Sequence, residues 1–200
     1  ETVVMTGYKD AEYVIEGERV KLVNGVAETE VMPGSASKVV TRYFGNELKT
    51  DLDGDGSEDV VFLLTQEPGG SGTFFYAVAA LNTDLGYVGS DGYFLGDRIA
   101  PQTTEVSQNP RHKNVIVVNY ADRKPDEPMN AAPSVGKSVY LKLDKETMQW
   151  GIVEPDFEGE SNILPSTVTG NVNGLIMLGP TCPVVMNPPD PGCADKPYAT

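Results

Sequence analysis

The sequence predicts a mainly β protein built from antiparallel sheets, with an α+β arrangement as the alternative. β-Branched residues are abundant: there are 24 Val and 15 Thr against 13 Leu and 12 Ala, which favours strands over helices. The 21 Gly and 15 Pro divide the chain into short segments. Two nearly continuous apolar runs, 60–64 and 73–81, are typical of strands that are covered on both faces.

The first third of the chain contains the signals of short strands joined by tight turns. Residues 11–31 alternate in polarity around Gly17 and around Asn24-Gly25, which predicts a meander. Residues 38–44 alternate and are β-branched, so we expect a strand there rather than a helix that begins after Pro33.

The central and later segments extend the same pattern. Gly69-Gly70-Ser71-Gly72 separates two buried strands that we expect to be neighbours, and Pro-rich residues 122–135 form a long loop that is a candidate binding loop. The remaining strands are expected at 93–95, 115–120, 138–143 and 148–153, the last two joined by a turn at 144–147.

Composition changes after residue 153, which predicts a domain boundary. Residues 1–153 would form a β-rich calcium-binding domain, and residues 154–167, rich in acids, Gly and Pro, a linker. Residues 168–200 would form a C-terminal strand-and-loop extension, because they hold one apolar stretch followed by a Pro-rich loop. That stretch must pair with a sheet of this domain or of another chain, and it consists of Gly174, Leu175, Ile176, Met177 and Leu178.

Residues 51–59 match the D-x-D-x-D-G-x-x-D spacing of short calcium loops. Alternate side chains in such a loop converge on one cation, and a glycine permits the sharp turn. The alternative is an acidic turn in which Asp and Gly simply favour turn conformations. The carboxylates would repel one another without a cation, which favours a bound Ca²⁺ over the acidic turn. We expect this Ca²⁺ to have a structural role. The expected ligands are the carboxylates of Asp51, Asp53, Asp55 and Asp59 and the backbone carbonyl of Ser57.

The loop departs from an EF-hand because its twelfth position is Phe62 instead of a bidentate Glu, so no helix–loop–helix is expected. It resembles the loops of integrin-type propeller repeats and thrombospondin type 3 modules. That similarity implies a ligand pattern and no particular fold.

The two cysteines, Cys182 and Cys193, enclose a segment without helix propensity. Two Cys without His partners do not make a zinc site, so we expect a disulfide formed in an oxidising compartment. Closing that loop would contribute roughly 2–3 kcal/mol in the loop-entropy model. The protein is therefore expected to be extracellular or at the cell surface.

Charge and residue inventory exclude several classes of function. A formal charge of −14 argues against nucleic acid as a partner, and no apolar run is long enough for a transmembrane segment. With one histidine, His112, interpreted as an exposed turn residue, and no nucleophile motif, we expect no enzyme.

Residues 51–64, 69–76 and 95–98, taken together, resemble an uncharacterised bacterial envelope domain of the LppP/LprE lipoprotein type, over about residues 10–153. The resemblance implies an exported protein and carries no catalytic residues. The chain departs from that family in lacking a lipid-bearing N-terminal Cys. Residues 179–183, 188–191 and 193–198 are similar to the start of transthyretin-like, carboxypeptidase-regulatory-like modules.

These observations lead to two hypotheses about function. The first is a calcium-stabilised extracellular structural protein that self-assembles into a surface filament, with residues 168–200 donated to a neighbouring subunit or bound by another surface protein. The second is a monomeric secreted or envelope-anchored module that binds a glycan or a protein, with Tyr87, Tyr93, Tyr120 or Trp150 as the stacking residues.

Overall fold

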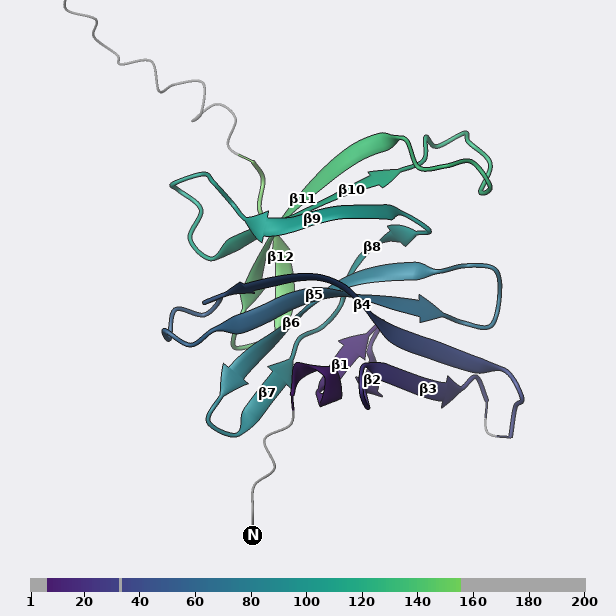
Figure 1. Ribbon diagram of the computed structural model, residues 1–200, viewed down its shortest axis with the longest axis horizontal. Coiled ribbons are helices and arrows are strands. Elements are labelled where there is room, and N and C mark those ends of the chain that lie inside the picture. The colour runs from purple at the N-terminus through teal and green to yellow at the C-terminus, as the bar shows by residue number, and fades with distance from the viewer. Residues whose placement is uncertain (1–6, 33, 156–200) are drawn as a thin grey trace, which may run out of the picture. The chain divides into compact units, whose positions relative to one another are not determined.

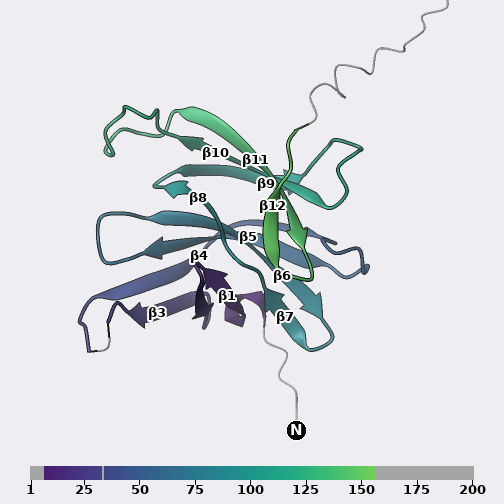
Figure 2. The ribbon, with the colours of Figure 1, turned by 180° about the vertical axis from the view of Figure 1, so that it is seen from behind.

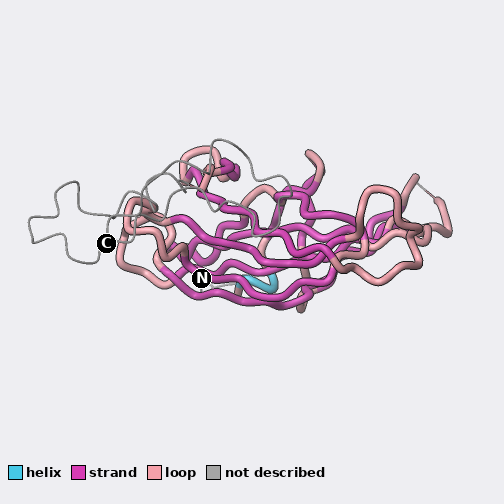
Figure 3. The backbone as a smooth tube through the Cα atoms, turned by 90° about the horizontal axis from the view of Figure 1, so that it is seen from above, coloured by secondary structure: helices cyan, strands magenta, loops and turns pink. Residues whose placement is uncertain are grey.

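The computed structural model describes residues 7–32 and 34–155, and strands account for nearly all of the regular structure there (Figure 3). One short 3-10 helix, η1 (Tyr8–Asp10), precedes the strands. The strands are β1 (Glu12–Ile15), β2 (Glu18–Lys21), β3 (Val26–Glu30), β4 (Lys38–Thr50), β5 (Asp59–Glu67), β6 (Phe74–Thr83), β7 (Gly86–Gly89), β8 (Tyr93–Asp97), β9 (Ala100–Val106), β10 (Val115–Asp122), β11 (Val135–Asp144) and β12 (Gln149–Ile152).

The strands form three antiparallel sheets, which confirms the predicted fold class. The largest has the order β3-β4-β5-β6-β7, with β8 also paired to β6. A four-stranded sheet, β12-β11-β10-β9, contributes side chains to one face of it, and the β1–β2 hairpin contributes to the opposite face. Figure 1 shows β9, β10 and β11 above β4, β5 and β6, with β1 and β2 below them.

β5 lies at the centre because both of its faces are apolar. Val61 and Leu63 point into a first core shared with β10 and β11, whereas Val60, Phe62 and Leu64 point into a second core shared with β1 and β2. All five side chains are at most 1% exposed. The expectation that 60–64 is a strand covered on both sides is confirmed. The next apolar run is its expected neighbour: it forms β6, which pairs with β5 in the antiparallel direction.

β4 contains two bulges whose effects on side-chain direction cancel. The pairing shifts by one residue between Tyr43 and Gly45 and again between Gly45 and Leu48. One extra residue in β4 would turn every following side chain to the opposite face of the sheet. The extra residue of the second bulge restores the alternation. Gly45 and Asn46 adopt positive φ angles of 122° and 53° to make this possible.

The meander predicted over residues 11–31 is only partly correct. Its three strands exist, but β3 pairs with β4 and not with β2. Val26 also forms an isolated bridge with Val23, which lies beyond the end of β2. β7 and β9 were not predicted, because β7 is a short segment bounded by glycines and β9 contains Pro101.

The β11–β12 hairpin, which Figure 2 shows, confirms the predicted strand–turn–strand, but its turn covers residues 145–148 rather than 144–147. Beyond residues 154 and 155, the predicted linker and the whole C-terminal extension lie outside the described residues. None of the helices in the described ranges has the length and hydrophobicity that a membrane crossing requires.

Candidate cation site

The acidic loop connects β4 to β5 and is shaped by its own carboxylates. Asp51 accepts hydrogen bonds from the backbone N–H groups of Gly54 (2.7 Å) and Gly56 (3.0 Å). Both glycines have positive φ angles, 82° and 88°, which other residues rarely adopt. The Asp and Gly spacing therefore curls the chain around the first carboxylate.

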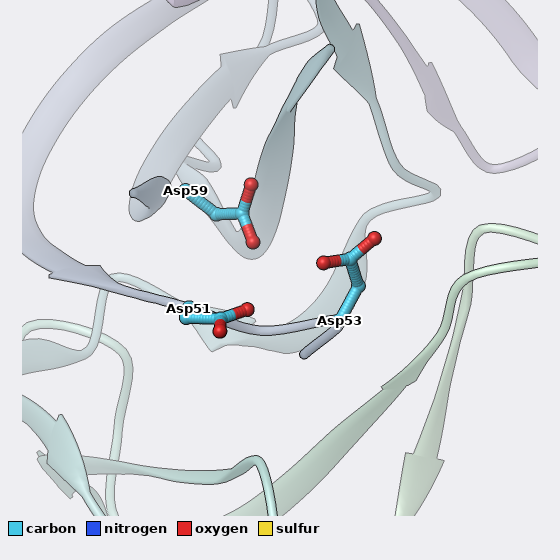
Figure 4. Close-up of side chains that lie close together, drawn as sticks. All are labelled: Asp51, Asp53 and Asp59. Carbon is cyan, nitrogen blue, oxygen red and sulfur yellow. The ribbon is translucent and has the colours of Figure 1, made fainter. Parts of the chain in front are cut away.

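Three of the expected ligands converge. Carboxylate oxygens of Asp51, Asp53 and Asp59 lie within 4.8 Å of one another, and Figure 4 shows the three groups facing a common space. Asp55 is not part of this carboxylate cluster; its Oδ1 accepts a hydrogen bond from the Ser57 N–H at 2.6 Å.

Asp59 is the most unusual member because it is 1% exposed. Its two oxygens accept hydrogen bonds from the backbone N–H groups of Leu52 and Asn82, both at 2.8 Å. Burial raises the pKa of Asp59, and the charges of Asp53 and Asp55 raise it further; the two backbone hydrogen bonds offset only part of this. Ionisation of this buried carboxylate is therefore less favourable than it would be in water.

The positive charge near the cluster is small. Within the described ranges, neither Asp51 nor Asp59 forms an ion pair, and Lys145 approaches only Asp53, with its Nζ at 4.0 Å from the carboxylate and 3.2 Å from the carbonyl oxygen. Each carboxylate oxygen has two lone pairs, so those bonded to an N–H keep acceptor capacity. This donor set is hard and all-oxygen, which suits Ca²⁺ or Mg²⁺ rather than a soft metal.

Residues distant in sequence fix the loop. Asn82 lies on β6, Asn114 Nδ2 donates to the Leu52 carbonyl at 2.9 Å, and Lys145 is on the β11–β12 turn. Sequence reasoning missed all three. The register between the two central strands could have placed Asn82 beside Asp59, whereas no local signal marks the other two.

A groove of about 660 Å³ adjoins the loop. Leu52, Asp53 and Asn114 line one part of it, and residues 142–146 and 151–153 of the β11–β12 hairpin line the rest. Its lining is mixed, with apolar side chains beside ammonium groups and carboxylates.

The predicted long loop between β10 and β11 is present and anchored by Arg123. This guanidinium donates to the carbonyl oxygens of Ala131 (2.6 Å), Arg98 (3.0 Å) and Asp97 (3.3 Å). The other predicted features, the Cys182–Cys193 disulfide and the 174–178 strand, lie outside the described residues.

His112 is not the simple exposed residue that the sequence suggested. Its Nδ1 lies 2.7 Å from Ser107 Oγ, and its ring packs edge-on against Tyr140. Ser107 is 8% exposed and also receives the Asn109 N–H at 3.4 Å, so the pair holds the turn that leads into β10.

The four aromatic residues considered for sugar stacking are at least partly buried. Tyr120 is a member of the first core, and Tyr93 and Trp150 pack against that core. Tyr87 packs against the second core. Their placement gives no support to the stacking hypothesis.

Comparison with known proteins finds no family model, no curated protein and no solved structure that matches this chain.

Proposed function

We propose that this protein is an extracellular structural β domain stabilised by Ca²⁺ bound in the Asp51–Asp59 loop. The observation that carries the proposal is the convergence of three carboxylates, one of them the buried Asp59, without a matching set of positive side chains among residues 7–32 and 34–155. A bound cation would offset both the repulsion and the desolvation that raise the pKa of Asp59.

Ca²⁺ is favoured over Mg²⁺ by the kind of ligands available. Ca²⁺ accepts six to eight oxygen ligands in flexible geometry, whereas Mg²⁺ requires a near-ideal octahedron and retains several waters. A loop offering carboxylates and backbone carbonyls fits the first pattern. We expect a Kd of roughly 10⁻⁴–10⁻³ M, as in extracellular modules.

Isothermal titration calorimetry of the metal-stripped full chain tests this proposal. Ca²⁺ should bind one site, and Asp53→Asn should weaken binding at least about tenfold through the loss of one ligand charge. Glu58→Gln is the matched control, since Glu58 is in the same loop but its carboxylate pairs with Lys49 at 3.1 Å. No heat of binding at millimolar Ca²⁺, or equal effects of the two substitutions, would contradict the assignment.

Self-assembly into a filament by strand donation is the second part of the proposal, and it is supported by the sequence of residues 174–178. Light scattering and electron microscopy of the full chain, with and without a chelator, would show polymers if the proposal is correct. Ile176→Asp should abolish them while Asp53→Asn reports their dependence on the cation. A wild-type chain that stays monomeric at high concentration would eliminate this part and leave the calcium proposal standing.

The groove beside the loop favours one alternative function, a monomeric module that binds a ligand. It places Lys142 and Lys145 near the apolar side chains of Leu143 and Ile152, a combination found in small-molecule and peptide sites. Screening of glycans and peptides by NMR would support the alternative if shifts map to these groove residues and Lys142→Ala removes them.

A further inference from the structure

One carboxylate joins the N-terminal segment, residues 7–11, to β4. Glu47 Oε1 accepts hydrogen bonds from the hydroxyls of Tyr8 and Tyr43, both at 2.6 Å. Lys9 Nζ lies 3.7 Å from the same oxygen and 3.8 Å from the centre of the Tyr43 ring. Glu47 lies within the second bulge of β4, and Tyr8 and Lys9 lie on η1.

The segment covers an aromatic cluster on the second core. Phe62 is fully buried, and its ring centre lies 5.4–5.6 Å from those of Tyr8, Tyr13 and Tyr43. The Tyr13 hydroxyl donates to the Tyr8 carbonyl at 2.6 Å. Displacement of η1 would remove one ring from Phe62 and the partner of the Tyr13 hydroxyl.

Other hydrogen bonds join residues 9–11 to the connection between β2 and β3. Gly25 N–H donates to the Lys9 carbonyl at 2.8 Å, and Leu22 N–H donates to the Ala11 carbonyl at 3.1 Å. Asp10 accepts the Asn24 N–H at 2.6 Å. On β4, the Glu47 carboxylate therefore holds η1 by a hydrogen bond and an ion pair, beside the contact of Lys9 with the Tyr43 ring.

We propose that residues 7–11 form an acid-sensitive latch: protonation of Glu47 frees η1 from β4 and uncovers the aromatic cluster around Phe62 while the central sheet stays folded. A carboxylate accepts both phenol hydrogen bonds on one oxygen and attracts Lys9, whereas a neutral carboxyl group is a weaker acceptor and has no charge to attract Lys9.

The charged and titratable groups around Glu47 favour its ionised form at neutral pH, as a latch that opens in acid requires. Burial alone would raise the pKa of Glu47, but the hydrogen bonds from Tyr43 and Tyr8 and the charge of Lys9 lower it below the ordinary 4.5. A lowered carboxyl pKa contributes stability that is complete above the unfolded value and is lost as pH falls through the folded value. The groups that face this site are Tyr8, Lys9 and Asp10 from the segment, Tyr43 and Lys49 from β4, and Tyr87 from β7.

Amide hydrogen exchange of the full chain, followed by NMR from about pH 7 to about pH 3, measures latch opening directly. Protection of the Gly25 amide, corrected for intrinsic exchange, should fall on the order of tenfold or more below the ordinary glutamate pKa. The Val78 amide in β6 should keep its protection over the same range. Glu47→Gln should lower Gly25 protection at neutral pH and remove its dependence on acid.

Asp10→Asn is the matched control, since it removes the other carboxylate bound to this region and should leave the acid response in place. Tyr8→Phe and Tyr43→Phe each delete one hydrogen bond to Glu47 and should each lower Gly25 protection, so they test the latch even if Glu47→Gln does not fold. Gly25 protection that is unchanged in acid, a parallel loss at Val78, or a response abolished by Asp10→Asn would overturn the proposal.

Discussion

Calcium should raise the thermal stability of the metal-stripped chain by an amount that follows from its affinity. With a Kd of roughly 10⁻⁴–10⁻³ M, addition of about 10 mM Ca²⁺ stabilises the folded state by about 1.4–2.7 kcal/mol. For a domain of about 150 residues this corresponds to a rise in Tm of roughly 3–11 °C. The shift requires no new packing, since Asp51, Asp53 and Asp59 already face one another.

Asp53→Asn tests the contribution of one carboxylate charge, because Asn has nearly the same shape as Asp and no charge. Asp53 Oδ1 accepts only the Asp55 N–H at 3.1 Å, a bond that an Asn side-chain carbonyl can also accept. The loop should keep its shape and lose more than half of the calcium-dependent shift. Glu58→Gln should retain the full shift, because Glu58 points to Lys49 on the protein surface.

Differential scanning calorimetry with Ca²⁺, with Mg²⁺ and with chelator measures the effect. Mg²⁺ should give a smaller shift at the same concentration because the loop cannot easily form a strict octahedron. Equal shifts in wild type and Asp53→Asn would refute the assignment of the cation to this loop, and so would the absence of any shift in the wild type.

Three further predictions concern the scaffold and the site. Gly89→Ala should destabilise the fold by about 1–3 kcal/mol or prevent folding, because the new Cβ would lie 2.2 Å from the Glu12 carbonyl oxygen. Urea denaturation measures this loss. Gly136→Ala is the control, because its Cβ would meet nothing within 4 Å. Phe62→Ala should lower the free energy of unfolding by about 3–5 kcal/mol in the same assay. A loss as small as that of a typical surface substitution, about 0.5 kcal/mol, would contradict the place of Phe62 in the second core. Calcium affinity should fall as pH is lowered toward the raised pKa of Asp59, since protons compete for that carboxylate; an affinity by titration calorimetry that is independent of pH would argue against Asp59 as a ligand.

Much of the strand content could be predicted because burial on both faces leaves a local signature. The run Val60-Val61-Phe62-Leu63-Leu64 has no polar position, and its β-branched residues and short length favour a strand with a core on each side. The 9-residue acidic loop was likewise visible, because its Asp and Gly spacing dictates a turn in which carboxylates converge.

Pairing over long sequence distance could not be read in the same way. β3 leaves the β1–β2 hairpin to pair with β4, because the hairpin covers the second core while β3 extends the central sheet. The two compensating bulges of β4 leave the side-chain alternation unchanged at its ends, so no periodicity reveals them.

The sequence by itself determined that the chain is β-rich, which segments are buried and where acidic ligands gather. Those properties depend on neighbours along the chain, whose side-chain period and turn chemistry are local. Only the tertiary structure decided that the buried Asp59 accepts the Asn82 N–H, that Lys145 reaches Asp53, and that Glu47 accepts hydrogen bonds from two tyrosine hydroxyls. Such contacts join residues brought together by sheet packing, and their geometry exists only once both cores have formed.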